Sequence, residues 1–152
     1  MIRKIGIGLA GFGTVGAGVY KNLLRNGSLL EQRLGVKFDV RRIAVRDLQK
    51  VRDVDAPAEL FTTSPDDLLL DSSIDVVVEL MGGIDIPLAF VKKAIHAGKI
   101  VVTGNKALLA EHGREIFELA HEKRVPVFYE AAVAGGIPII KSVREAFVGN
   151  RF

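Results

Sequence analysis

The chain has 152 residues, a length that suits one domain, and its 49% hydrophobic and 26% charged residues are typical of globular proteins. A net charge of +3, no Trp and no basic block interleaved with aromatics exclude an evident nucleic-acid surface, and no uncharged stretch is long enough to span a membrane. The absence of Cys excludes disulfides. Because Met1–Lys4 leads directly into the first predicted strand and leaves no room for a signal peptide, we expect a cytoplasmic protein without membrane partners.

The first element is a strand that ends in a glycine-rich turn. A strand is predicted over 4–10, and Gly11, Gly13 and Gly16 then form a G-x-G-x-x-G pattern that opens a helix. In this context the pattern is the fingerprint of a dinucleotide-binding loop. The first glycine permits the turn, the second lets a pyrophosphate approach the backbone, and the third allows close helix–strand packing. The following helix points free N–H groups at the phosphates. A glycine turn without a ligand is the alternative.

The remaining elements alternate between helix and strand. Helices are predicted over 15–24 with a stop at Asn26-Gly27, with a further turn over 29–34, from a cap at Ser64, and over 87–97, 113–123 and 139–147. Strands are predicted over 38–45, 60–63, 76–80, 100–103 and 125–129. This alternation predicts an α/β fold, a Rossmann-type doubly wound parallel sheet with helices on both faces, in one domain over 1–152. Ligands of such sheets bind at the carboxyl ends of the strands.

Arg46 and Asp47 follow the second predicted strand. An acidic residue at this point usually holds the ribose hydroxyl of NAD, whereas an arginine accommodates the 2′-phosphate of NADP. Arg46 therefore favours NADP as cofactor, with Lys50 as a second phosphate partner. NAD bound through Asp47 is the alternative. Arg46 also lies far beyond Gly16, which indicates an insertion in the first crossover.

Three later loops carry candidate chemistry. Gly82 and Gly83 follow an apolar strand and permit close approach to the ribose or nicotinamide, although a plain turn fits equally. Lys106 lies at the carboxyl edge, where it can bind a carboxylate or carbonyl oxygen or move a proton; a surface lysine is the alternative. Glu130 precedes a stretch of small residues whose oxygen atoms suit a hard cation, a cofactor contact or a helix entry.

No other chemistry-bearing cluster is evident. The three histidines, His96, His112 and His121, fall on predicted helices without other ligands at metal-binding spacing. We expect them to be surface or partly buried residues.

Five segments together resemble the N-terminal half of homoserine dehydrogenase. They are Gly-Leu-Ala-Gly-Phe-Gly-Thr-Val-Gly (8–16), Ala-Val-Arg-Asp (44–47), Glu-Leu-Met-Gly-Gly (79–83), Val-Thr-Gly-Asn-Lys-Ala-Leu-Leu-Ala (102–110) and Glu-Ala-Ala-Val-Ala-Gly-Gly-Ile-Pro (130–138). The family interconverts aspartate 4-semialdehyde and homoserine by hydride transfer with NAD(P)H. The resemblance covers nearly the whole chain, and its last two segments are the most specific.

The resemblance implies roles for individual residues. Arg46 matches the position that selects NADP in many members, and Lys106 matches a catalytic lysine beside the nicotinamide and the substrate. Glu130 and the carbonyls of Val133, Gly135 and Ile137 match a site for Na⁺ or K⁺. The implied cofactor contacts, beyond the glycines, are Phe12, Thr14, Val15, Met81 and Gly82.

The chain departs from the family pattern at its end. In the family, a region that binds substrate and forms dimers follows this point, and many members add a regulatory domain. The sequence ends at Phe152, and we expect both parts to be absent from this chain. We therefore expect this chain to bind cofactor with little or no turnover. For the full-length protein the resemblance implies a small-molecule substrate, a homodimer or homotetramer, and a place in threonine and methionine biosynthesis.

Two other functions compete with this interpretation. The cofactor domain of another two-domain amino-acid or semialdehyde dehydrogenase is one, and the segments at Asn105-Lys106 and 130–138 argue against it. A non-catalytic dinucleotide-sensing module is the other. The apolar ending over 137–148, which resembles a helix awaiting a partner domain, argues against a free-standing module.

Overall fold

A parallel sheet organises the part of the chain that the computed structural model describes, residues 2–52 and 54–146. Its strand order is β3-β2-β1-β4-β5-β6. The strands are β1 (Arg3–Ala10), β2 (Val36–Ala44), β3 (Phe61–Thr62), β4 (Val76–Glu79), β5 (Ile100–Thr103) and β6 (Val127–Phe128). Successive strands are added on one side of β1 as far as β3 and then on its other side from β4 onward. This is the doubly wound arrangement predicted from the sequence.

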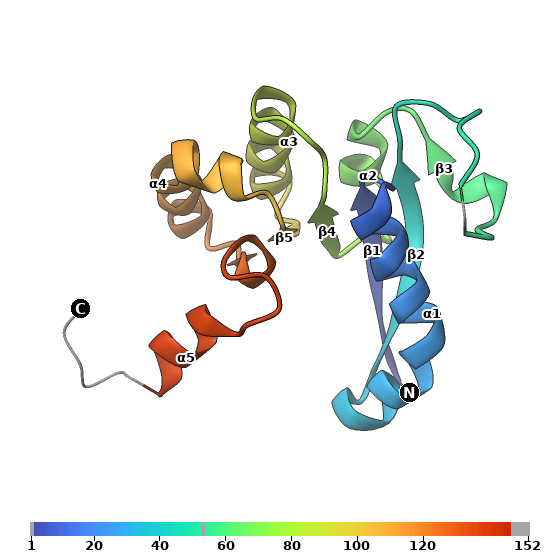
Figure 1. Cartoon of the computed structure of the whole chain (residues 1–152), viewed down its shortest axis with the longest axis horizontal. Helices are drawn as coiled ribbons and strands as arrows, with labels where there is room; N and C mark the ends of the chain where they lie inside the picture. The colour runs from blue at the N-terminus through green and yellow to red at the C-terminus, as the bar shows by residue number, and fades with distance from the viewer. Residues whose placement is uncertain (1, 53, 147–152) are drawn as a thin grey trace.

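Helices connect the strands. They are α1 (Thr14–Leu34), α2 (Asp66–Leu70), α3 (Asp85–His96), α4 (Lys106–Lys123) and α5 (Ile139–Glu145), with short 3-10 turns η1 (Ala58–Leu60) and η2 (Glu130–Ala132). In Figure 1, α3 and α4 lie together, α1 lies across the strands from them, and α5 extends away from the sheet. None of the helices in the described ranges is long and apolar enough to cross a bilayer.

Each face of the sheet has its own core. Alternate strand residues point to opposite faces, so Leu9 packs in the cluster beneath α1 while Ala10 packs in the cluster with α3 and α4. Tyr20 of α1 joins the first cluster, and Phe90 and Ile116 join the second. Burial of both faces explains why β4 is an apolar run without a polar face.

The register brings the carboxyl ends of four strands into line. Ala10 pairs with Ala44 on one side and with Glu79 on the other, and Glu79 in turn pairs with Thr103. The loops that follow β2, β1, β4 and β5 therefore begin at one level of the same edge. This edge carries the glycine turn and the candidate residues of the later loops.

Two helices are longer than the sequence predicts. The expected stop at Asn26-Gly27 is wrong, because α1 continues to Leu34 and ends at Gly35, whose φ of 68° is left-handed. The expected insertion in the first crossover is this extension. The predicted start of α4 at residue 113 is also wrong: the helix begins at Lys106, because the Asn105 side chain accepts a hydrogen bond from the Leu108 N–H and caps it.

The predicted cap of α2 is likewise wrong. Pro65, not Ser64, is the N-cap residue of α2, and no side chain forms a capping hydrogen bond there. Ser64 instead donates its backbone N–H to the Thr62 hydroxyl, which itself donates to Asp67. The acidic first turn at Asp66 and Asp67 is as predicted.

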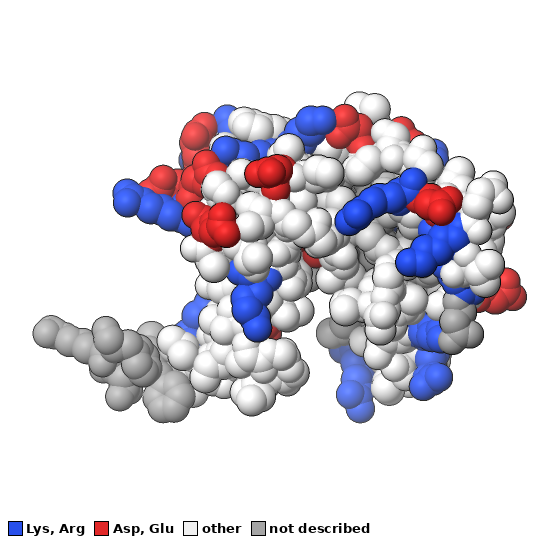
Figure 2. Space-filling view, turned by 45° about the horizontal axis from the view of Figure 1, so that its top comes forward, with Lys and Arg blue, Asp and Glu red and all other residues white. Residues whose placement is uncertain are grey.

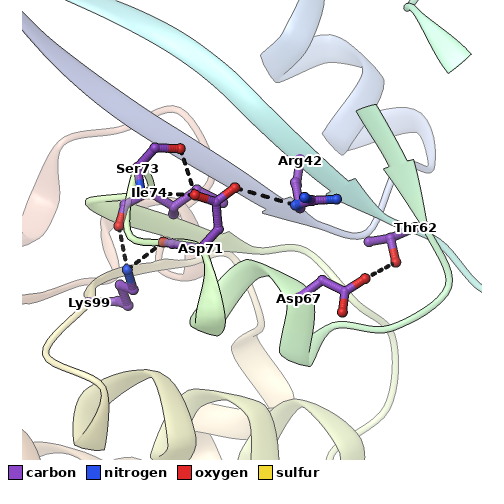
Figure 3. Close-up of polar contacts among 7 residues, drawn as sticks. All are labelled: Arg42, Thr62, Asp67, Asp71, Ser73, Ile74 and Lys99. Carbon is purple, nitrogen blue, oxygen red and sulfur yellow. Dashed lines mark hydrogen bonds and ion pairs between the residues drawn. The ribbon is translucent and has the colours of Figure 1, made fainter. Parts of the chain in front are cut away.

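Polar contacts anchor the turn that leads into β4, at the edge opposite the candidate site (Figure 3). The Lys99 ammonium donates to the carbonyl oxygens of Asp71 and Ile74 at 2.8 and 2.7 Å. Asp71 accepts from Ser73 and pairs with Arg42 at 3.3 Å. The Ser73 hydrogen bonds, followed by Arg42, lower the pKa of the Asp71 carboxyl. This edge is occupied by structural contacts, which leaves the carboxyl edge for a ligand.

Candidate functional site

The glycine turn is held against two neighbouring strands. Gly11 has a φ of 105°, and its N–H donates to the Ala44 carbonyl at 3.0 Å. A Cβ at Gly11 would lie 2.6 Å from the Leu80 carbonyl oxygen. Both the backbone conformation and the space therefore require glycine, as the fingerprint predicts.

The other two glycines of the fingerprint differ in their surroundings. A Cβ at Gly16 would lie 2.3 Å from the Gly11 carbonyl oxygen, so close packing requires glycine there. Gly13 has nothing within 4 Å of a Cβ and borders open space. Gly13 is also the N-cap of α1, and the first turn has neither a capping side chain nor an acidic residue. The N-terminal N–H groups of α1 thus face an open approach.

The side chains of the same turn point in different directions. The Phe12 ring is buried and packs edge-on against Tyr20 and Phe61, with centroids 5.7 and 5.4 Å apart. Only the backbone of Phe12 is available to a ligand, and its ring fixes the turn to the core. Thr14 and Val15 are exposed at the start of α1. Val15 also begins a groove along α1 that Gly18, Val19, Asn22 and Leu23 line.

Arg46 lies beside the loop after β4. Its Nη2 atom would lie 3.8 Å from a Cβ built on Gly82, which brings together loops from opposite halves of the sheet. The Arg46 side chain is exposed and forms no hydrogen bond or ion pair with any residue in the described ranges. The Arg46 guanidinium at the carboxyl edge, without a partner among the described residues, can therefore bind an anion.

Arg52 organises the loop that carries Arg46, a role the sequence analysis missed. Its guanidinium donates to the carbonyl oxygens of Asp47 and Lys50 and lies 5.1 Å from the centroid of the Phe61 ring. The Asp47 carboxylate accepts the Gln49 N–H at 2.8 Å. Asp47 is thus engaged in its own turn, whereas Arg46 has no hydrogen bond or ion pair within residues 2–52 and 54–146. A cation–π contact between residues distant in sequence leaves no local signal.

A buried carboxyl lies between the loops that follow β4 and β5, and sequence reasoning missed its role too. Glu79 is fully buried; it accepts the Met81 N–H at 2.7 Å and the Thr103 hydroxyl at 2.6 Å. Burial raises the pKa of the Glu79 carboxyl, against the opposing effect of the hydrogen bonds from Thr103, Met81 and Asn105. A lone acid at the end of an otherwise apolar strand was the available signal.

Asn105 joins the same two loops and begins α4. Its amide group donates to the Gly83 carbonyl at 2.9 Å, while its oxygen caps the helix at Leu108. Lys106 follows as the first residue of α4. Its exposed side chain has no partner in the part of the chain that the structure describes. The structure therefore brings Lys106 beside Met81-Gly82-Gly83.

The predicted cation segment forms a tight structure of its own. The Glu130 carboxylate accepts the N–H groups of Ile140 and Lys141 at 3.0 and 3.1 Å and so holds the N-terminus of α5. The Glu130 and Ile137 carbonyls accept local hydrogen bonds, whereas those of Val133 and Gly135 accept none from described residues. An oxygen-only donor set of this kind fits a hard cation.

The histidines lie where the sequence analysis expected them. His96 and His121 are exposed, and His112 pairs with Glu115 at 2.9 Å. Within residues 2–52 and 54–146, no three His, Cys, Asp or Glu side chains cluster to hold a metal.

Parallel sheets of order 3-2-1-4-5-6 with a glycine fingerprint at the switch point form the class of Rossmann dinucleotide-binding domains, and the fold and glycine turn place this chain in that class. A family model narrows the class, since the model described as "Homoserine dehydrogenase, NAD binding domain" matches residues 11–130. The chain therefore belongs to the homoserine dehydrogenase family, as its NAD-binding domain.

Individual relatives agree with the family model. The chain is 45% identical to the homoserine dehydrogenases of Neisseria gonorrhoeae and Pseudomonas aeruginosa over 150 residues, 99% of this chain and 34% of each relative. The solved homoserine dehydrogenase of Thiobacillus denitrificans superimposes with a TM-score of 0.88 at 47% identity, over 98% of this chain and 34% of that one. The chain thus spans about a third of these relatives.

A more distant structure carries a ligand. A hyperthermophilic archaeal homoserine dehydrogenase, solved in complex with NADPH, matches 96% of this chain and 50% of its own length, with a TM-score of 0.77 and 26% identity.

Proposed function

We propose that this chain binds NADP(H) at the carboxyl edge of its sheet and supplies the cofactor half of homoserine dehydrogenase. The observation that carries the proposal is the glycine turn, where Gly11 and Gly16 are sterically required while Gly13 opens onto free space at the N-terminus of α1. A helix N-terminus with unpaired N–H groups attracts a phosphate. Family membership supports the same assignment.

Arg46 supports NADP rather than NAD. Its guanidinium has no partner among the residues that the structure describes, whereas the alternative ribose partner Asp47 already accepts a hydrogen bond from Gln49. Charge-assisted, bidentate bonds to a 2′-phosphate favour arginine. The archaeal relative in complex with NADPH agrees with this preference.

Lys106 is the proposed catalytic residue. The bound cofactor would supply a hydride to the carbonyl carbon of aspartate 4-semialdehyde, and a proton would reach the carbonyl oxygen to give homoserine. Lys106 follows Asn105, whose side chain contacts the Gly83 carbonyl, and its exposed side chain has no partner among the described residues. It would bind the carbonyl oxygen or supply the proton.

Further parts of the proposal concern the cation and the whole protein. The carbonyls of Val133, Gly135 and Ile137, together with Glu130, would hold Na⁺ or K⁺ and thereby stabilise the turn before α5. We also propose that the full-length protein is a cytoplasmic homodimer or homotetramer acting in threonine and methionine biosynthesis.

The test is a titration of the chain with NADPH and NADH, followed by reduced-cofactor fluorescence. We expect tighter binding of NADPH. Arg46→Ala should weaken NADPH binding about ten- to hundredfold, as expected for the loss of a charge-assisted bond, with little change for NADH. Arg41→Ala is the matched control, because it removes the same charge from an exposed arginine paired with Asp39 on β2.

Two other results of these titrations would contradict parts of the proposal. Unchanged NADPH affinity in Arg46→Ala would move ribose recognition to Asp47 and contradict the preference for NADP. Failure of the wild-type chain to bind either nucleotide would overturn the proposed function.

A further inference from the structure

We propose that Glu79 is a positioning residue that locks the loop after β4 to the start of α4, so that Lys106 and the nicotinamide end of the cofactor meet in a fixed geometry. This inference rests on the proposed function. It adds a role to a residue buried beneath the site.

Glu79 holds the loop after β4 directly. Its Oε1 atom accepts the Met81 N–H at 2.7 Å, immediately before Gly82 and Gly83. The Asn105 amide group holds the same loop from the other side, since it donates to the Met81 and Gly83 carbonyls at 3.4 and 2.9 Å. The Glu79 carboxyl group and Asn105 together therefore set where the Met81-Gly82-Gly83 backbone lies.

Glu79 reaches α4 through Thr103. Its Oε2 atom accepts the Thr103 hydroxyl at 2.6 Å, and the same hydroxyl oxygen accepts the Asn105 N–H at 3.1 Å. Asn105 then closes the circuit, since its side chain donates to the Gly83 carbonyl at 2.9 Å. Lys106 is the next residue, so this closed ring of hydrogen bonds determines where its backbone begins.

The sheet itself does not need an acid at this position. Glu79 is fully buried and pairs in register with Thr103, and the three preceding strand residues are valines. A buried carboxyl is unfavourable unless it is hydrogen-bonded, and an apolar pair would satisfy the sheet without that penalty. The carboxyl group is therefore better explained by the loops it holds than by the strand that carries it.

The topology confines the expected effect to one end of the cofactor. In doubly wound folds each half-sheet binds one mononucleotide. Arg46 follows β2 in the first half, whereas Glu79 and Thr103 end β4 and β5 in the second. Arg46 borders Gly82, but Arg52 holds the Arg46 loop through the Asp47 and Lys50 carbonyls, independently of Glu79. Loss of the Glu79 contacts should therefore weaken binding of the nicotinamide end more than binding of the 2′-phosphoadenosine end.

The experiment compares two ligands by calorimetry on the 152-residue chain. NADPH contains the nicotinamide, whereas 2′-phospho-ADP-ribose shares the rest of the molecule without it. Glu79→Ala and Thr103→Val should each weaken NADPH about tenfold, because binding must then order a loop that these contacts hold in place beforehand, and leave the fragment within about twofold. Glu79→Gln should recover much of the NADPH affinity, because its amide oxygen still accepts the Met81 N–H.

Thr62→Val is the matched control. Thr62 ends β3, donates its hydroxyl to Asp67 and accepts the Ser64 N–H, which repeats the Thr103 arrangement in the other half of the sheet. This variant should leave the ratio of NADPH to fragment affinity unchanged.

The outcomes separate this inference from the proposed function. Equal weakening of both ligands, or unchanged NADPH binding in Glu79→Ala and Thr103→Val, would overturn the positioning role while the proposed function stands. If Glu79→Ala does not fold, Thr103→Val, which keeps Glu79 and nearly the same side-chain volume, decides the question. Failure of the wild-type chain to bind either ligand would overturn the proposed function and this inference with it.

Discussion

Gly11, Gly13 and Gly16 belong to one motif, but each is glycine for a different reason. Gly11 needs a left-handed backbone, and a side chain at Gly16 would collide with the Gly11 carbonyl. Gly13 meets neither constraint, since its φ is −81° and its surroundings are open. Only Gly13 is therefore left without a structural reason to be glycine, and a phosphate approaching the backbone would supply one.

Gly13→Ala should separate binding from folding. We expect the free energy of unfolding to change by less than about 1 kcal/mol, because the added Cβ meets no neighbour and only the N-cap preference is altered. NADPH affinity should fall at least about tenfold, since the Cβ would occupy the pyrophosphate approach. Urea unfolding and fluorescence titration measure the two effects. Gly16→Ala is the contrast, with an expected loss of stability, and full NADPH affinity in Gly13→Ala would contradict the site.

Glu79 should give stability a dependence on pH. Burial raises its pKa above the ordinary 4.5, so the folded chain binds this proton more tightly than the unfolded chain does. The stabilisation is complete below pH 4.5 and is lost as the pH rises through the folded pKa. Urea unfolding of wild type and Glu79→Gln from pH 4.5 to about pH 8 should show their difference, wild type minus variant, falling with pH. A difference that grows with pH would contradict the raised pKa.

At the scale of the elements, α1 continues through a local stop signal. Asn26-Gly27 is a turn-like pair, yet the helix runs through it to Leu34 and ends at Gly35, whose N–H donates to the Glu31 carbonyl. Tyr20 and Leu23 pack the earlier part of α1 on the core, and the left-handed Gly35 closes its last turn. One glycine in a helix interior costs only about 1 kcal/mol, too little to stop a helix that is anchored at both ends.

Gly27→Ala tests the continuous helix. In a helix interior the change should stabilise the chain by about 0.5–1 kcal/mol, since no atom lies within 4 Å of the new Cβ. Thermal unfolding should show a rise of about 2–4 °C. Gly35→Ala is the control and should destabilise, because its φ of 68° disfavours a side chain. No gain from Gly27→Ala would indicate that the helix ends where the sequence suggests.

At the scale of the whole molecule, the described surface is notched between two lobes, and Lys and Arg side chains lie on both sides of the notch (Figure 2). Apolar side chains near the end of the described chain remain exposed, among them Phe128 and Ile137 at 53% and 63%. The chain spans about a third of the length of its relatives.

We expect the 152-residue chain to bind NADPH without turning over homoserine. The reason is that the chain covers about a third of the length of its homoserine dehydrogenase relatives, and the family resemblance implies that the substrate is bound by a region outside that third. Absorbance of NADPH formed from homoserine and NADP⁺ should match the rate without protein, while a full-length relative assayed in parallel verifies the conditions. A robust homoserine-dependent rate from this chain alone would contradict the expectation.

The sequence by itself determined the fold class and the place of the site. Strand and helix periodicity, the glycine turn and the position of Lys106 after β5 are local signals, because the chemistry that produces them acts between neighbouring residues. The strand order confirms the fold class, and the steric need for Gly11 and Gly16 agrees with the glycine turn. The place of the site and the role of Lys106 stay predictions. The helix boundaries near Gly27 and residue 113 were wrong because the Gly35 and Asn105 caps decided them.

Only the tertiary structure decided how the loops are held to one another. Glu79 and Thr103 are 24 residues apart, and Arg46 meets Gly82 across the switch point of the sheet. Arg52 fixes its loop through the Phe61 ring, which in turn contacts Phe12 of the glycine turn. Such pairs form only when the sheet register aligns the ends of strands that are distant in the chain, so no local pattern could have shown them.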